Sequence, residues 1–344
     1  MTKYIEEKFL RFPAIYFGNK SRVGKAVWKR FGNVDRYIEP FCGSCGVFWK
    51  RPLSHFSDGR SRSEILNDRD SYLTNFLRSV LLEPQKTAFH SVNPVTELDL
   101  IARYRYLAFG PEKKGLKMKM KTDPDYCNPK LAGWWAWGMS CWIGGDRFFS
   151  MVGDNWTKIP ELQTEKGCTK PAKVKVTREG LKTIAYQADQ ITRWYNTLSN
   201  RMFHARITCG DWSRVVSSPS LLRGAGAGKV GVFLDPPYPT VYEDGKKSTI
   251  QTYDTRDNKE GKLIRLQKDV FQWCQDNGDL RVAVCGYAGD GYEKLVKDFG
   301  WTELKWKASG GFSNLGKTDS IAKKNSVRER IWFSPSCLKT SSLF

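Results

Sequence analysis

Residues 230–242, VGVFLDPPYPTVY, join an apolar run to an abrupt acidic and proline-rich end. The five residues 230–234 have the length and continuous apolarity of a strand that is covered on both faces, as in a parallel sheet. Asp235 should then stand at the carboxyl end of that strand. Pro236 disfavours helical backbone at Asp235, and the two proline rings fix φ at successive positions while they remove two backbone donors. The stretch therefore predicts a stiff loop with free carbonyls at one edge of an α/β sheet.

This loop offers the groups that a flat ligand with amino hydrogens requires. Asp235 supplies a carboxylate, Pro236 a carbonyl, and Tyr238 an aromatic face. In open α/β sheets, ligands bind in the crevice beyond the carboxyl ends of the strands. A nucleobase fits this description. Taken alone, however, the same residues would more often be a turn and a ring packed on the sheet.

Length, hydropathy and cysteine use point to a globular protein of a reducing compartment. The 344 residues suffice for one large or two ordinary domains, and no apolar run approaches the roughly 18 residues of a membrane span. The first twelve residues, MTKYIEEKFLRF, carry charges where a signal peptide needs an apolar core. Nine cysteines, odd in number and irregularly spaced, argue for free thiols. We expect a protein of the cytoplasm, in a prokaryote or a phage-infected host cell, that binds no membrane.

The balance of charge is the strongest global feature. The chain carries 56 Lys and Arg against 36 Asp and Glu, a formal net charge of +20. A field of that sign attracts polyanions, of which nucleic acid is the usual one. A surface charged for solubility and a binder of acidic membranes are the alternatives. Cys42 and Cys45 form a single C-x-x-C without a second pair at zinc-finger spacing, so we expect no metal there.

Strand and helix signals alternate in two separated parts of the chain. Strands are expected around Tyr37 and Ile38, at Ile65 and Leu66, before Gly210, at 230–234, up to Gly286 and in the final RERIWFS, and helices at 20–31, near Gly46, from the acidic turn at Asn67 and Asp68 to Pro84, and near 260–277. The pattern predicts one doubly wound α/β domain, 1–83 plus 205–344, interrupted by an inserted module at 84–204.

The insert has a different character. Residues 110–123, GPEKKGLKMKMKTD, read as a mobile basic stretch, and residues 308–326 of the other part read as a flexible basic loop. Four tryptophans crowd one segment of the insert, at 134, 135, 137 and 142, and we interpret them as core residues rather than base-stacking platforms.

Acidic and glycine-rich turns follow several of the predicted strands. Glu39 precedes a turn with Gly43 and Gly46, and Asp68 and Asp211 end two further strands. A glycine turn after the first strand lets the backbone approach a ligand closely, and an acid after the second is placed to bind ribose hydroxyls. The pattern favours a nucleoside cofactor, although Asp68 and Asp211 would also serve as ordinary helix caps.

Taken together and in this order, the segments YFGNK (16–20), YIEPFCGSCGVF (37–48), LND (66–68), CGDW (209–212) and FLDPPY (233–238) resemble the Dam-like, α-class family of DNA adenine-N6 methyltransferases. The ring-rich WWAWGMSCWIGG and the final RERIWFSP resemble its phage-type members. The resemblance covers both parts of the α/β domain and the insert only loosely. Two cysteines inside the glycine turn depart from the family, where other small residues are common.

The resemblance implies a Rossmann-like methyltransferase fold with a mainly helical target-recognition insert, and S-adenosylmethionine as cofactor without a metal. It implies cofactor-binding residues in the N-terminal loop, which are Tyr16, Gly18 and Lys20, and in the main pocket, which are Glu39, Pro40, Phe41, Gly43 and Gly46. It also implies that Asp68 binds the ribose, that Asp211 lies near the cofactor adenine, and that Asp235 contacts the cofactor as well as the base.

The resemblance also gives the motif at 235–238 a chemistry, with Asp235, Pro236, Pro237 and Tyr238 as the catalytic set. The N6 lone pair of adenine is delocalised into the ring. Hydrogen bonds to the Asp235 carboxylate and the Pro236 carbonyl would localise it, while Tyr238 stacks on the base. Catalysis would then rest on positioning and electrostatics. In a duplex the base must first leave the stack, and the stretch Pro239–Lys262, with Tyr242 and Tyr253, is expected to cover it.

Double-stranded DNA is the expected partner of a monomer or weak dimer. The residues expected to touch it are Lys113, Lys114, Lys117, Lys119, Lys121 and Arg147 of the insert, and Lys323, Lys324, Arg328 and Arg330 near the C-terminus. RNA adenine or cytosine-N4 methylation, and a catalytically inactive DNA-binding protein, stay open as alternatives. Cytosine-C5 methylation requires a Pro-Cys nucleophile that the sequence lacks, and a protein-glutamine substrate fits the charge less well.

Overall fold

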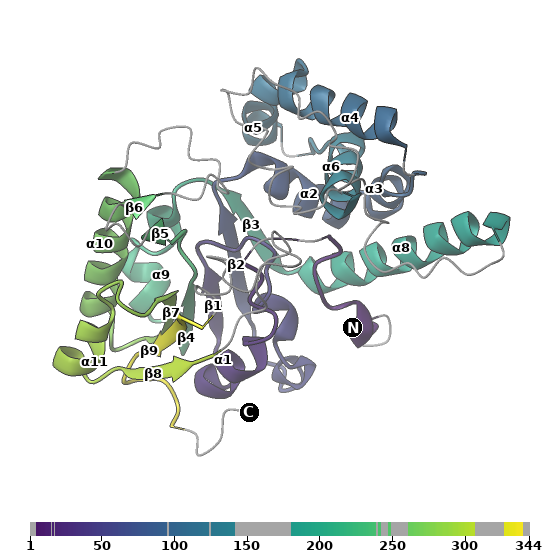
Figure 1. The fold of residues 1–344 in the computed structure, drawn as a ribbon. Helices are drawn as coiled ribbons and strands as arrows, with labels where there is room; N and C mark the ends of the chain where they lie inside the picture. Colours follow the sequence, from purple (N-terminus) through teal and green to yellow (C-terminus); the bar gives the residue numbers. More distant parts are fainter. Residues whose placement is uncertain are drawn as a thin grey trace. The chain divides into compact units, whose positions relative to one another are not determined.

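The computed structural model describes residues 5–14, 16, 18–94, 96–123, 125–141, 180–238, 240–241, 247–248, 261–306 and 327–339. The chain forms two compact units (Figure 1). The helical unit comprises Met1–Gly18 and Asp68–Cys209, and the sheet unit comprises Asn19–Asn67 and Gly210–Phe344. The chain passes between the units at 18/19, 67/68 and 209/210. The sequence pattern predicts domain boundaries at 83/84 and 204/205.

The sheet unit is built on a mixed sheet. Its strands are β1 (Arg36–Glu39), β2 (Ser63–Asp68), β4 (Val230–Leu234), β7 (Arg281–Tyr287), β8 (Thr302–Lys305) and β9 (Glu329–Phe333). They follow the order β2-β1-β4-β7-β9-β8. Strand β1 runs parallel to β2 and β4, β4 runs parallel to β7, and β9 is antiparallel to both β7 and β8. The α/β class is confirmed, and β8 is a short strand that the sequence pattern did not reveal.

Short helices and turns connect these strands. The α-helices are α1 (Gly24–Phe31), α9 (Pro219–Arg223), α10 (Gly261–Asp276) and α11 (Glu293–Phe299). The 3-10 helices are η3 (Phe48–Lys50), η4 (Leu53–Phe56) and η5 (Trp212–Val215). Two further strands of two residues each, β5 (Thr240–Val241) and β6 (Lys247–Ser248), pair antiparallel with each other. The helix predicted near Gly46 is wrong. That segment is a run of turns that ends in η3, because Gly43 and Cys45 adopt positive φ values of 43° and 54°, which interrupt a right-handed helix.

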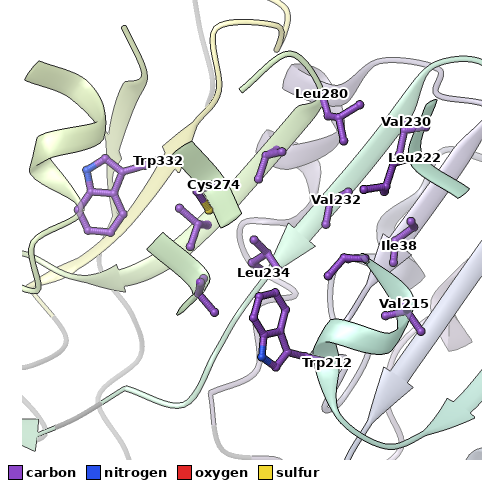
Figure 2. Packing of buried hydrophobic residues seen from close by; sticks show 14 of the residues in the cluster. Ile38, Trp212, Val215, Leu222, Val230, Val232, Leu234, Cys274, Leu280 and Trp332 are labelled. Carbon is purple, nitrogen blue, oxygen red and sulfur yellow. The ribbon is translucent and has the colours of Figure 1, made fainter. Parts of the chain in front are cut away.

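Residues of β4 alternate between the two faces of the sheet. Val230, Val232 and Leu234 belong to one buried hydrophobic cluster with Leu222 of α9 and Cys274 of α10 (Figure 2). Such alternation follows from the two-residue period of a strand. The same cluster takes up Ile38 of β1 and Trp332 of β9, so this face of the sheet is closed by α9, α10 and η5.

The opposite face of the sheet is covered by α1. A Cβ atom added to Gly231 would lie 3.1 Å from the Phe31 ring, so glycine gives α1 its close approach to β4. Trp28 of α1 packs on Tyr37 of β1 with ring centroids 4.8 Å apart. Because both faces carry helices, the central strands read as continuous apolar runs, as the sequence predicts for residues 230–234.

The helical unit contains most of the predicted insert. It comprises η2 (Glu7–Phe9), α2 (Ser71–Leu82), α3 (Pro84–Ser91), α4 (Glu97–Phe109), α5 (Glu112–Thr122), α6 (Pro129–Cys141), α8 (Gly180–Met202) and β3 (Ala205–Cys209). Helix α6 packs against α2, α3 and α4, and α8 packs against α2 and α3. The Asp70 carboxylate caps α2, and Pro84 begins α3 at its first turn after α2 has ended.

Residues 110–123 are not the mobile stretch that their composition suggests, because most of them form α5. Lys and Met are good helix formers, and acidic Glu112 in the first turn and basic Lys119 and Lys121 in the last turn complement the helix dipole. Leu116 is fully buried and anchors the helix. Charge density alone therefore misled the interpretation of this segment.

The tryptophans of α6 are largely core residues. Trp135 and Trp137 are buried and Trp134 is half-buried, while Trp142 lies outside the described residues. The stretch 308–326 also lies outside them. In the part of the chain that the structure describes, no helix combines the length and the apolar character needed to cross a membrane.

Candidate active site

The residues of the candidate site gather on the α1 face of the sheet, near the carboxyl ends of β1, β4 and β7. Along β1, Tyr37 and Glu39 lie on the α1 face of the sheet. Ile38, between them, lies on the opposite face, in the hydrophobic cluster that contains Val232 and Leu234. Glu329 pairs with Tyr287 across β9 and β7. Since paired residues of antiparallel strands project to the same side, the antiparallel β9 brings its first residue to the edge where the parallel strands end.

Asp235 uses both of its carboxylate oxygens within the protein. The Tyr238 hydroxyl donates a hydrogen bond to Oδ1 at 2.6 Å, and the Lys20 ammonium lies 3.1 Å from Oδ2. The carboxylate therefore bridges its own loop and the segment that precedes α1. A ligand with amino hydrogens that binds Asp235 must replace one of these contacts, and the Tyr238 hydroxyl is the easier to replace because separating Lys20 from Asp235 would leave buried charges unpaired.

Lys20 is a buried charge with two acidic neighbours. Its side chain is only 5% exposed, and its ammonium lies 3.1 Å from Asp235 and 3.6 Å from Glu329 Oε2. The ammonium also stands 5.1 Å from the centre of the Tyr238 ring. The sequence resemblance assigned Lys20 to the cofactor, and the structure brings it to the motif expected to hold the target base.

Tyr238 is held as a neutral phenol. Burial and the charge of Asp235 raise the pKa of its hydroxyl well above the usual value. Its ring meets Tyr287 edge-on with centroids 4.8 Å apart. Burial, with the nearby Glu329 carboxyl, raises the pKa of Tyr287 to about 12. Pro236 is buried and Pro237 is half-buried, so the two rings brace the loop between Asp235 and Tyr238.

Glu39 is a second buried acid. Burial raises the pKa of its carboxyl well above the usual range, and the negative charge of Asp235 adds to the shift, while a hydrogen bond from Tyr37 opposes it. The Tyr37 hydroxyl donates to Glu39 Oε2 at 3.0 Å. Glu39, the acid predicted for the cofactor pocket, thus lies at the end of β1, where Tyr37 of the same strand holds its carboxyl.

The turn after β1 is shaped by a close approach of backbone. A Cβ atom added to Gly46 would lie 2.7 Å from the Ser21 nitrogen and 2.8 Å from Asn19 Oδ1, which real Cβ atoms do not reach. Asn19 Oδ1 in turn accepts a hydrogen bond from the Ser21 backbone at 2.8 Å. Gly46 therefore makes room for the segment that carries Lys20. The sequence pattern had predicted that this glycine makes room for a ligand.

Asn67 is a positioning residue that the sequence interpretation missed. Its buried side-chain amide donates to the Pro40 carbonyl at 2.9 Å and to the Gly210 carbonyl at 3.1 Å. The backbone carbonyl of Asn67 accepts a hydrogen bond from the Cys42 backbone N–H at 2.9 Å. One side chain thus links the turn after β1 to the turn before η5. The available signal was an amide on a buried strand, where an unpaired polar group would be costly.

Phe41 and Asp211 flank the turns that Asn67 joins. Phe41 stacks on Trp212 with ring centroids 5.6 Å apart and planes at 22°. Asp211 is exposed, and its Oδ1 accepts hydrogen bonds from the backbone and hydroxyl of Ser213 at 3.0 and 2.6 Å. Asp211 therefore caps η5, which was the alternative to its predicted role near the cofactor adenine.

Three of the predicted cofactor residues fall in the helical unit. Tyr16 packs edge-on against Phe12 at 5.6 Å, and Gly18 has a positive φ of 73°. Asp68 is the last residue of β2, is half-buried, and accepts a hydrogen bond from the Asp70 backbone at 3.0 Å.

The residues predicted to bind nucleic acid divide into three groups. Lys113, Lys114, Lys117, Lys119 and Lys121 are on α5, where Lys119 and Lys121 are exposed and Lys117 is half-buried. Arg328 donates to the Ala288 carbonyl and stacks on Tyr287, while Arg330 pairs with Glu303 at 3.2 Å. Arg147, Lys323 and Lys324, and the expected flap residues Tyr242 and Tyr253, lie outside the described residues.

Within the described ranges, no group of three or more His, Cys, Asp or Glu side chains could hold a metal ion. Cys42 and Cys45 are both buried. Comparison with protein-family models finds no match for the chain, and comparison with curated proteins finds none either.

Proposed function

We propose that this chain is an S-adenosylmethionine-dependent methyltransferase that acts on the N6 amino group of adenine in DNA. The observation that carries the proposal is Asp235, a carboxylate fixed directly after a central parallel strand by Lys20 and by the Tyr238 hydroxyl. Such a group accepts hydrogen bonds in a fixed direction once an arriving base has displaced the Tyr238 hydroxyl from it. The high content of Lys and Arg supports a nucleic-acid substrate.

The layered sheet unit supports a Rossmann-like methyltransferase fold. Four parallel strands in the order β2-β1-β4-β7 are continued by an antiparallel strand, and helices cover both faces. The site lies at the carboxyl ends of the central strands, the edge at which open α/β sheets bind ligands. The helical unit would then be the target-recognition module.

The residues at the turn after β1 fit the proposed cofactor in their chemistry. S-adenosylmethionine supplies a methyl group on a cationic sulfonium, together with ribose hydroxyls and an adenine ring. The acids Glu39 and Asp211 of the sheet unit would oppose the positive charge and accept from hydroxyl or amino groups, and the half-buried Phe41 offers an aromatic face. The backbone of the Gly43 turn, with its positive φ, would line the pocket.

Within this proposal the motif at 235–238 prepares the adenine. Asp235 Oδ1 accepts one hydrogen of the N6 amino group once Tyr238 has released it, and the Pro236 carbonyl accepts the other. These bonds draw the lone pair from the ring onto nitrogen. The aromatic face of Tyr238 holds the extruded base, and the proton leaves nitrogen during or after methyl transfer, with Asp235 as its acceptor.

Methylation of a random-sequence duplex library with isotopically labelled cofactor tests the proposal. We expect label on adenine N6, at positions that share a short sequence. Label on cytosine N4, or on RNA in a parallel reaction, would reassign the substrate while it keeps the chemistry. Binding of DNA without label on any nucleic acid would favour an inactive DNA-binding protein, and failure to bind the cofactor in calorimetry would remove the enzyme class.

A further inference from the structure

Glu329 is a charged side chain of the candidate site that the proposed reaction does not use. It begins β9, is 9% exposed, and its Oε2 atom has no hydrogen-bond partner within the described part of the chain. Lys20 lies 3.6 Å from this atom, at ion-pair distance but just beyond a hydrogen bond. The shorter contact of the same ammonium goes to Asp235, at 3.1 Å. A buried carboxylate oxygen whose nearest cation is also the partner of another acid is costly unless it serves a purpose.

The groups around Glu329 come from four elements. Lys20 approaches from the segment before α1, Asp235 and Tyr238 from the loop after β4, and Cys285 and Tyr287 from β7. Its neighbours in the chain, Arg328 before β9 and Arg330 on β9, are held elsewhere, by the Ala288 carbonyl and by Glu303 of β8 respectively. Burial raises the pKa of the Glu329 carboxyl, the charge of Asp235 raises it further, and Lys20 opposes both.

We propose that Glu329 is a positioning residue that shares Lys20 with Asp235 and thereby sets how strongly Asp235 accepts hydrogen bonds from the target base. The inference rests on the proposed methyl transfer. When Glu329 carries its proton, Lys20 neutralises Asp235 alone. When Glu329 loses that proton to solvent, two carboxylates divide one ammonium, and Asp235 keeps more negative charge for the adenine amino group. No covalent bond other than that O–H bond changes.

The sign of the pH dependence follows from this arrangement. A stronger acceptor localises the N6 lone pair better, so methyl transfer should become faster as Glu329 ionises. Because its pKa is raised, the rise should fall above the ordinary glutamate range and closer to neutral pH. The Glu329→Gln variant carries a permanently neutral group of similar shape, so it should stay at the slower rate throughout.

Single-turnover methyl transfer with excess enzyme and saturating cofactor, followed between about pH 5.5 and pH 8.5, tests this. We expect the wild type to accelerate through the range, and Glu329→Gln to be about tenfold slower at the alkaline end with no such rise. Glu303→Gln is the matched control, since it removes the same charge from the neighbouring β8, where Glu303 pairs with Arg330. The control should keep the wild-type profile.

A wild-type profile in Glu329→Gln overturns the inference, even if its thermal midpoint falls, because a merely structural residue would change stability alone. An NMR titration of protein labelled with ¹³C at glutamate carboxyls gives a readout without substrate. The Glu329 signal, identified by its loss in Glu329→Gln, should titrate above the free glutamate range, and Lys20→Met should raise its midpoint further.

The NMR outcome separates this inference from the proposed function. An ordinary midpoint for Glu329, or one that Lys20→Met leaves unchanged, overturns the sharing of Lys20 whatever the enzyme does. A raised and coupled midpoint in a wild type that methylates no nucleic acid keeps the shared ion pair and overturns both its catalytic role and the proposed reaction.

Discussion

The sheet unit and the helical unit handle charge in opposite ways. In the sheet unit, Lys20 is 5% exposed and faces two acids, and burial raises the pKa of Glu39 and Glu329. In the helical unit, Lys119 and Lys121 project from α5 into solvent. Buried charges interact strongly at short range, whereas exposed ones are screened within about 10 Å at moderate salt.

This contrast predicts two kinds of mutational behaviour. In the buried site of the sheet unit, one atom exchanged in one side chain should change the chemistry, because each charged group has a fixed partner within 4 Å. On the exposed lysines of α5, single changes should matter little, and several lysines should act together through a salt-dependent field.

Asp235→Ala should reduce single-turnover methyl transfer by about 10³-fold or more, because it removes the acceptor for the N6 amino group. Asp235→Asn keeps a carbonyl oxygen but loses the charge, so transfer should stay slow and measurable. Cofactor affinity should change little in both variants. The control is Asp279→Ala. It removes a carboxylate that is not part of the candidate site and that pairs with Arg223 at 2.6 Å. Equal rates for Asp235→Ala and wild type would end the base-holding role.

Asn67→Ala should lower the free energy of unfolding by about 2–3 kcal/mol, because it leaves the buried Pro40 and Gly210 carbonyls without their donor. Urea denaturation followed by tryptophan fluorescence measures the change. Asn33→Ala, which removes hydrogen bonds to Asp58 and from Arg62 near the surface, should cost about 1 kcal/mol. If both variants were equally stable, the link between the two turns would carry little of the fold.

The fold follows from the sequence where one local signal dominates. The apolar run 230–234 between polar flanks predicted β4, and the acid after it predicted a group at the edge of the sheet. Helix α10 was predicted from a different signal, a long segment without Pro. Residues 110–123 were misread because charge density is a weak guide when helix propensity, dipole complementarity and one buried leucine agree on α5.

The site was visible only in part, because its geometry depends on contacts between distant segments. The pairing of Lys20 with Asp235 spans 215 residues of sequence, and no local pattern carries it. Glu329 was hidden because an antiparallel strand presents its first residue, rather than its last, at the site edge. Gly46 was noticed for its flexibility, while the reason for it, the passing backbone of Ser21, needs the structure.

Asp68→Ala should weaken S-adenosylmethionine by about tenfold, the usual cost of losing hydrogen bonds between a carboxylate and ribose hydroxyls. Isothermal calorimetry measures this without DNA. Asp70→Ala, which removes the cap of α2 two residues away, should destabilise the protein and leave the affinity unchanged. Unchanged affinity in Asp68→Ala would take Asp68 out of the ribose role and leave it as a turn residue.

Neutralising Lys117, Lys119 and Lys121 together should flatten the salt dependence of DNA binding and leave cofactor binding alone. Each lost phosphate contact reduces the slope of log affinity against log salt by about 0.9. Lys294, Lys297 and Lys305, all exposed in the sheet unit, provide a control set with the same change of charge. Equal slopes for the two triple variants would show a diffuse field without a DNA path along α5.

Tyr238→Phe should have the smallest effect, within about threefold of the wild-type transfer rate, because stacking on the base needs the ring and not the hydroxyl. The structure adds a reason for this expectation, since that hydroxyl occupies Asp235 Oδ1 at 2.6 Å and must withdraw before the adenine amino group can bind. Its loss removes a competitor and also an anchor of the carboxylate, and these effects oppose each other. Tyr238→Ala, which removes the ring itself, is the contrasting variant and should fail to hold the base. A Phe variant as slow as the Ala variant would make the hydroxyl a part of the chemistry, and base stacking would no longer explain the tyrosine.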